Sequence, residues 1–490
     1  MKSLIELISI TGPNLSIPGR AGYLYEAICE KKVKTDQEAI DLLFLMKTGR
    51  AQYFKARRVL QNTLINHIIT QPTTNDSTVR QAYFECIKGV AAYDILLRKG
   101  ARKKANALAQ RLLNTSIKYD FTEPAMRLAD GLMSEAGIIS NHPSAFKHYR
   151  KIFTKYLQQF NHKSEAKIMY AEILLHINSK KNLTRPLVDR FDRYAKKAEQ
   201  YLEMNSLDVS YFAFFIILYN EYINHNYTKI VKTVDQALES FPVIGTEKEF
   251  AFLINQVPAL VALKQYNKAR KAIRRAQPLV PQSSFNWSVA LFYRLVLCFH
   301  EQRYQEAYDI YKAANKGTKV EYGVMNEQWS IIKGFIKFLI KCEQIEPYVR
   351  EQFRLGKFLN ETPIFSKDKA GHNVNILIVQ FLFLLQNKRY GIIIDKLEAM
   401  RQYVQRYLNT KSLLRVKYFV KLLLLLPTCN FHKEAFLRKS TSLRKKLANT
   451  QLYITHNPDI EIIPYEDLLE LVIGQLETRM VYWSKERKRT

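Results

Sequence analysis

The stretch that decides the fold is KQYNKARKAIRRAQPLVP, residues 264–281. In it Tyr266 is followed at offsets of three, seven and ten by Ala269, Ile273 and Ala276. Offsets of three, four and seven place side chains on one face of an α-helix. The stretch therefore predicts an amphipathic helix that begins near the tyrosine and packs closely against a neighbour through its alanines.

The same spacing returns at four other places in the chain. An apolar segment of helical length precedes most copies, as in NWSVALFYRLVLCFHE and NVNILIVQFLFLLQNK. Self-similarity of this kind indicates a repeat architecture, in which each unit is a first helix, a short turn and a second helix. The four other copies are Tyr53, Ala56, Leu60 and Thr63; Tyr227, Ile230, Val234 and Ala237; Tyr304, Ala307, Tyr311 and Ala314; and Tyr390, Ile393, Leu397 and Met400.

These second helices resemble those of the tetratricopeptide repeat. The resemblance has two departures: the first helices carry Val257 and Leu295 where the family has a small residue, and Leu253 and Leu291 where it has a tryptophan. The units are also longer than the family's period of about 34 residues, since Ile230, Ala269 and Ala307 are spaced by 39 and 38. The matching residues are Ala237, Pro242, Ala269, Ala276, Pro281, Ala307, Tyr311 and Ala314.

The resemblance implies an all-α fold, a right-handed superhelical solenoid of about ten tetratricopeptide-like αα-hairpins. Weaker copies, such as those around Ala105 and Ala145, fill the gaps between the clearer ones. We expect an N-terminal helix and loop over residues 1–22 and the helical repeats over 23–449. Residues 450–490 then form a connection, a terminal capping helix over 465–484 and a basic tail.

The charge of the chain is strongly positive. It has 75 lysines and arginines against 45 acidic residues, a formal net charge of +30 that attracts polyanions. On the second helix of the opening stretch, Lys268, Lys271 and Arg275 fall outside the core face and are candidate contacts to nucleic-acid phosphates. Seven further cations and no acid lie between Arg98 and Lys118. The alternative is that these charges only keep a long solenoid in solution.

A second candidate surface follows from the resemblance, which implies that the first helices line a concave groove. The ligand-facing positions of the family would then be aromatic in this chain. Such a groove would accept an amphipathic helix or an extended peptide. Alternatively, the same side chains pack against neighbouring helices in a tight superhelix. The candidate protein-binding residues are Phe212, Phe215, Tyr219, Tyr222, Phe292, Phe299 and His300.

The sequence carries no catalytic signature that we recognise. It lacks the H-E-x-x-H, P-loop and G-x-S-x-G motifs, and its five cysteines never form C-x-x-C. We therefore expect no catalytic residue, metal, cofactor or small-molecule substrate. Its apolar runs are too short to span a bilayer, so we expect no membrane partner, and unpaired cysteines are typical of the reducing cytoplasm.

These features together predict a non-enzymatic scaffold or adaptor that binds a protein or peptide partner. One alternative is a basic solenoid associated with RNA or DNA. Another is a regulator that senses a peptide in the concave groove. Charge geometry separates the first two, because a continuous basic track favours nucleic acid and dispersed charges favour solvation.

Overall fold

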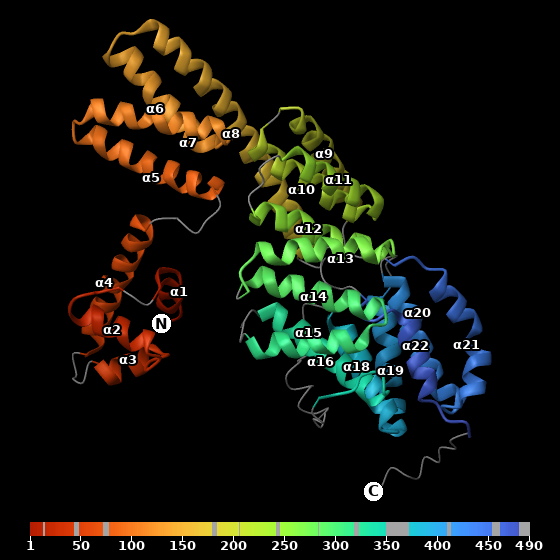
Figure 1. Cartoon of the computed structure of the whole chain (residues 1–490). Helices are drawn as coiled ribbons and strands as arrows, with labels where there is room; N and C mark the ends of the chain where they lie inside the picture. The colour runs from red at the N-terminus through yellow and green to blue at the C-terminus, as the bar shows by residue number, and fades with distance from the viewer. Residues whose placement is uncertain are drawn as a thin grey trace. The chain divides into compact units, whose positions relative to one another are not determined.

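The computed structural model is built of α-helices joined mostly by short connections (Figure 1). It divides into two compact units, Met1–Phe153 and Thr154–Thr490. The described part of the chain contains no strand, only an isolated bridge between His432 and Glu477, so the all-α expectation is confirmed there. The structure describes residues 1–12, 15–43, 49–71, 78–178, 184–204, 206–241, 246–282, 284–317, 323–348, 372–408, 413–452 and 461–479.

The first unit begins with four helices around a small apolar core that includes Leu24, Tyr25 and Tyr53. The helix α2 begins at Gly19, which corrects the expectation of a loop up to residue 22. Gly22 is required there, because a Cβ atom would overlap the backbone carbonyl oxygen of Ile17. The helices of this unit are α1 (Lys2–Thr11), α2 (Gly19–Cys29), α3 (Asp36–Leu43), α4 (Gly49–Thr70), α5 (Thr78–Arg98), α6 (Arg102–Lys118), α7 (Thr122–Ser134) and a π-helix (Glu135–Ile139).

The helix α8 (Pro143–Asn178) is 36 residues long, and the division between the two units falls inside it. A hairpin with Ala145 near the core frame was expected in this region, but the helix continues without a turn and Ala145 is only half-buried. The reason is local: no glycine or proline follows Pro143 before the end of the helix.

The second unit contains the predicted hairpins. Four second helices, α11, α13, α15 and α19, begin at the tyrosine of the repeated spacing, which confirms the sequence-based assignment of their starts. The helices are α9 (Arg185–Leu202), α10 (Leu207–Ile223), α11 (Tyr227–Ser240), α12 (Thr246–Ala262), α13 (Tyr266–Ala276), α14 (Phe285–His300), α15 (Tyr304–Gly317), α16 (Gly323–Lys341), α18 (His372–Gln386), α19 (Tyr390–Tyr407), α20 (Leu414–Leu425), α21 (Lys433–Ala448) and α22 (Tyr465–Gly474).

Five first helices of this unit end in the same turn. After α12, the N–H of Lys264 donates to the Val261 carbonyl at 2.9 Å, and the N–H of Gln265 donates to the Leu260 carbonyl at 2.8 Å. This pair of bonds is the Schellman motif, whose central residue adopts a left-handed conformation. The same two bonds close α10, α14, α16 and α18. The five left-handed residues are His225, Lys264, Gln302, Glu343 and Lys388, with φ between 53° and 59°.

One apolar core runs through the second unit from Ala166 to Leu476. The predicted core face of the opening stretch is confirmed, since Ala269, Ile273 and Ala276 are all buried. The terminal helix α22 ends at Gly474 and not at residue 484 as expected. Several expected features lie outside the described residues: Pro242, residues 453–460 of the connection, and residues 480–490 at the end of the expected terminal helix and tail. Among the described helices, none is long and apolar enough to cross a membrane.

Candidate functional site

The aromatic residues expected to line a groove are packed inside the second unit. Of the six phenylalanines and tyrosines among these candidates, five are buried and Phe212 is half-buried. The ring of Phe215 stacks on Phe252 of α12 with centroids 4.7 Å apart, and Tyr219 stacks on Tyr170 of α8 at 5.7 Å. Burial raises the pKa of Tyr219 and Tyr222 well above the usual value. These contacts correspond to the alternative in which the aromatic side chains bind neighbouring helices.

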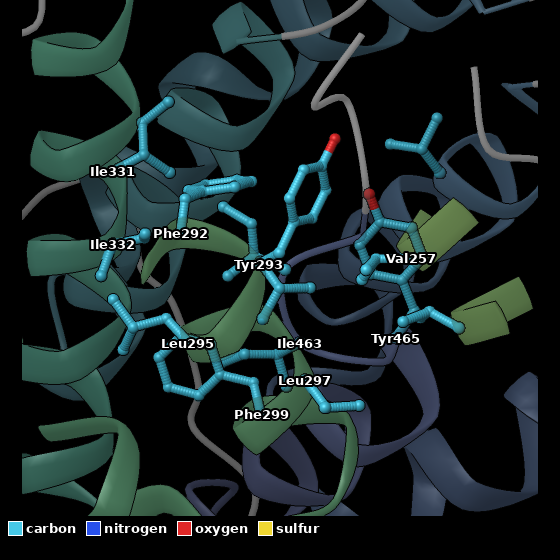
Figure 2. Packing of buried hydrophobic residues seen from close by; sticks show 14 of the residues in the cluster. Val257, Phe292, Tyr293, Leu295, Leu297, Phe299, Ile331, Ile332, Ile463 and Tyr465 are labelled. Atoms are coloured by element: carbon cyan, nitrogen blue, oxygen red, sulfur yellow. The ribbon is translucent and has the colours of Figure 1, made fainter. Parts of the chain in front are cut away.

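The chain's own C-terminal segment covers the end of α14. The buried His300 donates a hydrogen bond from Nε2 to the Glu461 carbonyl oxygen at 2.6 Å. Two residues further, the Gln302 side chain donates to Asp467 at 2.8 Å. Ile463 and Tyr465 belong to the same buried cluster as the α14 side chains (Figure 2). In this conformation a partner has no access to His300 or Phe299.

Arg415 of α20 holds this C-terminal segment in place. Its guanidinium donates to both carboxylate oxygens of Glu461 at 2.9 and 2.8 Å and also to Glu466. It donates further to the carbonyl oxygens of Leu447 and Thr450 at 3.1 and 2.9 Å. Burial opposes the charge of Arg415, but these carboxylates outweigh it and raise its pKa. Nothing in the local sequence pattern pointed to this cluster, because its members are 46 and 51 residues apart.

A cavity of about 690 Å³ lies beside the Arg415 cluster. Its wall includes the Arg415 guanidinium, whose donors are already used by protein acceptors, and the buried His300 ring. Burial lowers the pKa of His300 to about 4. The Arg415 cluster therefore has a structural role, because its polar groups form hydrogen bonds with one another.

The residues of α13 predicted to bind nucleic acid are exposed, but two arginines of this helix are paired with acids. Arg275 donates from Nε to Glu249 at 2.7 Å, and Arg270 pairs with Glu301. Both acids lie on other helices or turns, 26 and 31 residues away in the sequence, so the spacing within α13 did not reveal them. Lys268 and Lys271 remain exposed and form no ion pair with any described residue.

A larger set of free cations lies in the first unit, on α6, the turn before it and the first turns of α8. All ten are exposed, and none pairs with an acid among the residues that the structure describes. The adjoining chain is fully described, from residue 78 to residue 178. We call this set the α6–α8 basic surface: Arg98, Lys99, Arg102, Lys103, Lys104, Arg111, Lys118, Lys147, Arg150 and Lys151.

The cations of this surface follow the helices in an ordered way. Lys104, Arg111 and Lys118 are separated by seven residues, which places them on one face of α6 about 10 Å apart. A hydrogen bond of 3.3 Å from Gln110 to the Tyr149 hydroxyl joins α6 to α8. The positive charges therefore extend along α6 and continue onto the adjacent turns of α8.

One end of the basic surface adjoins a second cavity, of about 340 Å³. It lies between α5, the start of α6 and the π-helix, and Arg102 belongs to both the surface and the cavity wall. In the same wall, the guanidinium of Arg127 donates to both carboxylate oxygens of Asp94 at 3.2 Å each. We call this cavity the α5–α7 pocket. Its wall consists of Tyr93, Asp94, Leu97, Arg102, Arg127, Gly131, Ser134, Glu135, Ile138 and Ile139.

Two further observations bear on the chemistry of the chain. The five cysteines are free thiols, and no group of three or more His, Cys, Asp or Glu side chains in the described ranges could hold a metal ion. Compared with known proteins, the chain matches no family model, no curated protein and no solved structure. The geometry of the α6–α8 basic surface is therefore the main guide to function.

Proposed function

We propose that this chain is a non-enzymatic helical-repeat protein that binds nucleic acid through the α6–α8 basic surface. The observation that carries the proposal is the set of ten exposed cations that have no acidic partner in the described chain. Elsewhere, cations such as Arg190, Lys197 and Arg275 are paired with acids from adjacent helices. Unpaired cations along a helix are suited to successive phosphates of a polyanion, which are bound by charge and not by base identity.

We further propose that the hairpins form a right-handed, tetratricopeptide-like solenoid in the cytoplasm. Five first helices close with the same pair of backbone bonds, and their left-handed residues are spaced by 39, 38, 41 and 45 residues. A recurrent turn at near-constant spacing supports a stack of equivalent units. The free thiols are consistent with a reducing compartment.

The protein-scaffold function remains a prediction, as does the peptide-sensing regulator. Both were based on an aromatic groove, and those aromatic side chains now contact the chain itself. A protein partner would therefore bind at a surface other than these aromatic side chains.

Fluorescence anisotropy tests the nucleic-acid proposal, with a labelled single-stranded RNA and a DNA duplex titrated across a salt series. We expect affinity to fall steeply with salt, because each phosphate contact releases condensed counterions. The triple variant Lys104→Glu, Arg111→Glu, Lys118→Glu removes three contacts and should flatten the logarithmic salt dependence for the single strand by about 2.

The matched control is Lys268→Glu, Lys271→Glu, Arg274→Glu on α13, which makes the same change in net charge on exposed positions of the second unit. We expect it to bind much more tightly than the α6 variant. If the two triple variants lose affinity equally, the basic surface has no special role. If the wild type binds neither ligand at low salt, its charge serves only solvation.

A further inference from the structure

We infer that the α5–α7 pocket holds one unpaired base of a single-stranded nucleic acid bound to the basic surface, an inference that rests on the proposed function. Arg102 belongs to both features, so a strand whose phosphates follow α6 passes the mouth of the pocket. The volume of about 340 Å³ is at the lower end of the range of small-molecule sites, which suits one base and its sugar.

The pocket offers a flat surface on which a base can stack. The guanidinium of Arg127 is held by both oxygens of Asp94 at 3.2 Å, and Asp130 lies 3.7 Å away. Both bonds to Asp94 come from the same nitrogen, Nη2, and Asp130 lies beside the other terminal nitrogen, Nη1, so two acids restrain the guanidinium from different sides. Unpaired bases stack on arginine planes as they do on aromatic rings. Because its charge is already balanced by two acids, Arg127 is better suited to stacking than to binding a phosphate.

Another part of the pocket wall is apolar and exposed to water. Ile138 is 79% exposed and Ile139 is 51% exposed, and both lie on the π-helix. Covering exposed apolar side chains with a ligand is favourable, because it removes apolar surface from water. Single π-turns of this kind occur frequently at functional sites. A base inserted between Ile138 and the Arg127 plane would remove apolar surface from water on one face and stack on the other.

The polar groups of the pocket favour an unpaired base. The half-buried Glu135 forms no ion pair with any described residue, and Ser134 lies beside it in the wall. A carboxylate and a hydroxyl can accept hydrogen bonds from the amino group of a base edge. In a duplex that edge is already paired, so only a single strand can use it.

An anionic membrane is the competing occupant, since cations beside exposed isoleucines also suit a lipid surface. The acids of the pocket argue against it. Asp94 and Glu135 line the same pocket as Ile138 and would repel anionic headgroups there. The cations also extend along α6 to Lys118, far beyond the two isoleucines.

The test compares labelled 12-nucleotide single strands of several base compositions, as RNA and as DNA, with duplexes of the same sequences across a salt series. The variants are Ile138→Ala and Glu135→Gln, and the matched control is Ile168→Ala on α8, where the isoleucine is 68% exposed outside the pocket. We expect Ile138→Ala to weaken single-strand binding about threefold to tenfold. Glu135→Gln should change the order of preference among strands of different base composition.

Duplex binding and the salt dependence should stay unchanged in both variants, because neither removes a phosphate contact. Circular dichroism checks that the variants fold, as expected for exposed side chains. The base pocket is refuted if Ile138→Ala behaves like Ile168→Ala or if both variants affect duplex and single strand equally. In those cases the steep salt dependence and its loss in the α6 variant would still support the proposed function.

Phosphatidylserine vesicles provide the third arm of the experiment. Vesicle binding that Ile138→Ala abolishes, without binding of any nucleic acid, would overturn both the pocket assignment and the proposed function in favour of a membrane surface. Absence of vesicle binding, together with single-strand binding sensitive to Ile138, supports the base pocket.

Discussion

His300, at the end of α14, is neutral because burial opposes its charged form and lowers its pKa to about 4, from an ordinary value of 6.5. The Glu461 carbonyl oxygen accepts its Nε2 proton and favours the charged form, while Arg415 and Lys264 disfavour it. Protonating the ring in the folded protein is therefore unfavourable mainly because the ring is buried.

This gives a pH prediction. Between pH 6.5 and 4 the unfolded chain carries a proton on His300 and the folded chain does not, so stability falls as pH is lowered through this window. The variant His300→Gln keeps a hydrogen-bond donor without the titration. We expect its loss of stability over this window to be shallower, by up to about 1.4 kcal/mol per pH unit. Denaturant unfolding at a series of pH values measures this difference, and parallel profiles would contradict the assignment.

At the scale of elements, the five recurrent turns place ordinary residues in a conformation that favours glycine. Glu343 is the simplest case, since its side chain is exposed and φ is 59°. The substitution Glu343→Gly should raise the free energy of unfolding because glycine adopts this conformation without steric cost. The matched control Glu343→Ala keeps that cost. We expect the glycine variant to be about 1 kcal/mol more stable than the alanine variant in denaturant melts, and equal stability would show that the turn is unstrained.

Much of the hairpin architecture could be predicted from the sequence because it depends on neighbours within one helix. The spacing from Tyr266 to Ala276 specified a buried face, and the structure buries it. The same tyrosine marked the start of four second helices, whereas the copy at Tyr53 lies inside α4, which begins at Gly49. The spacing of Ala145 favoured a hairpin where α8 is continuous, because the absence of glycine and proline between Pro143 and Asn178 lets the helix extend.

The candidate site was harder to predict, because whether a cation is paired with an acid depends on residues that are distant in sequence. Arg275 looked free within its stretch, yet its partner Glu249 comes from α12. The contact between His300 and Glu461 spans 161 residues, which no local period can reveal. In contrast, the cations from Arg98 to Lys118 keep their free charge, because no described acid forms an ion pair with them.

At the scale of the whole molecule, the core around Tyr53 and the core that runs from Ala166 to Leu476 are separate. We therefore expect two calorimetric transitions. Gly22→Ala should lower only the first unit's transition, because the new Cβ would overlap the Ile17 carbonyl oxygen.

Arg415→Met is the corresponding change in the second unit. It leaves the buried Glu461 unpaired and should cost about 3–5 kcal/mol in that transition alone. If both variants move one common transition, the two units fold as a single cooperative body.

Because residues 461–465 cover the end of α14, that end stays exposed during part of the synthesis of the chain. A ribosome adds about 5–20 residues each second and releases the N-terminal part first. The end of α14 therefore emerges with its apolar side uncovered, and the segment that covers it is translated 161 residues later. During those seconds the nascent chain exposes Phe299 and its neighbours, so the newly synthesised protein is expected to be a substrate for chaperones that bind apolar segments.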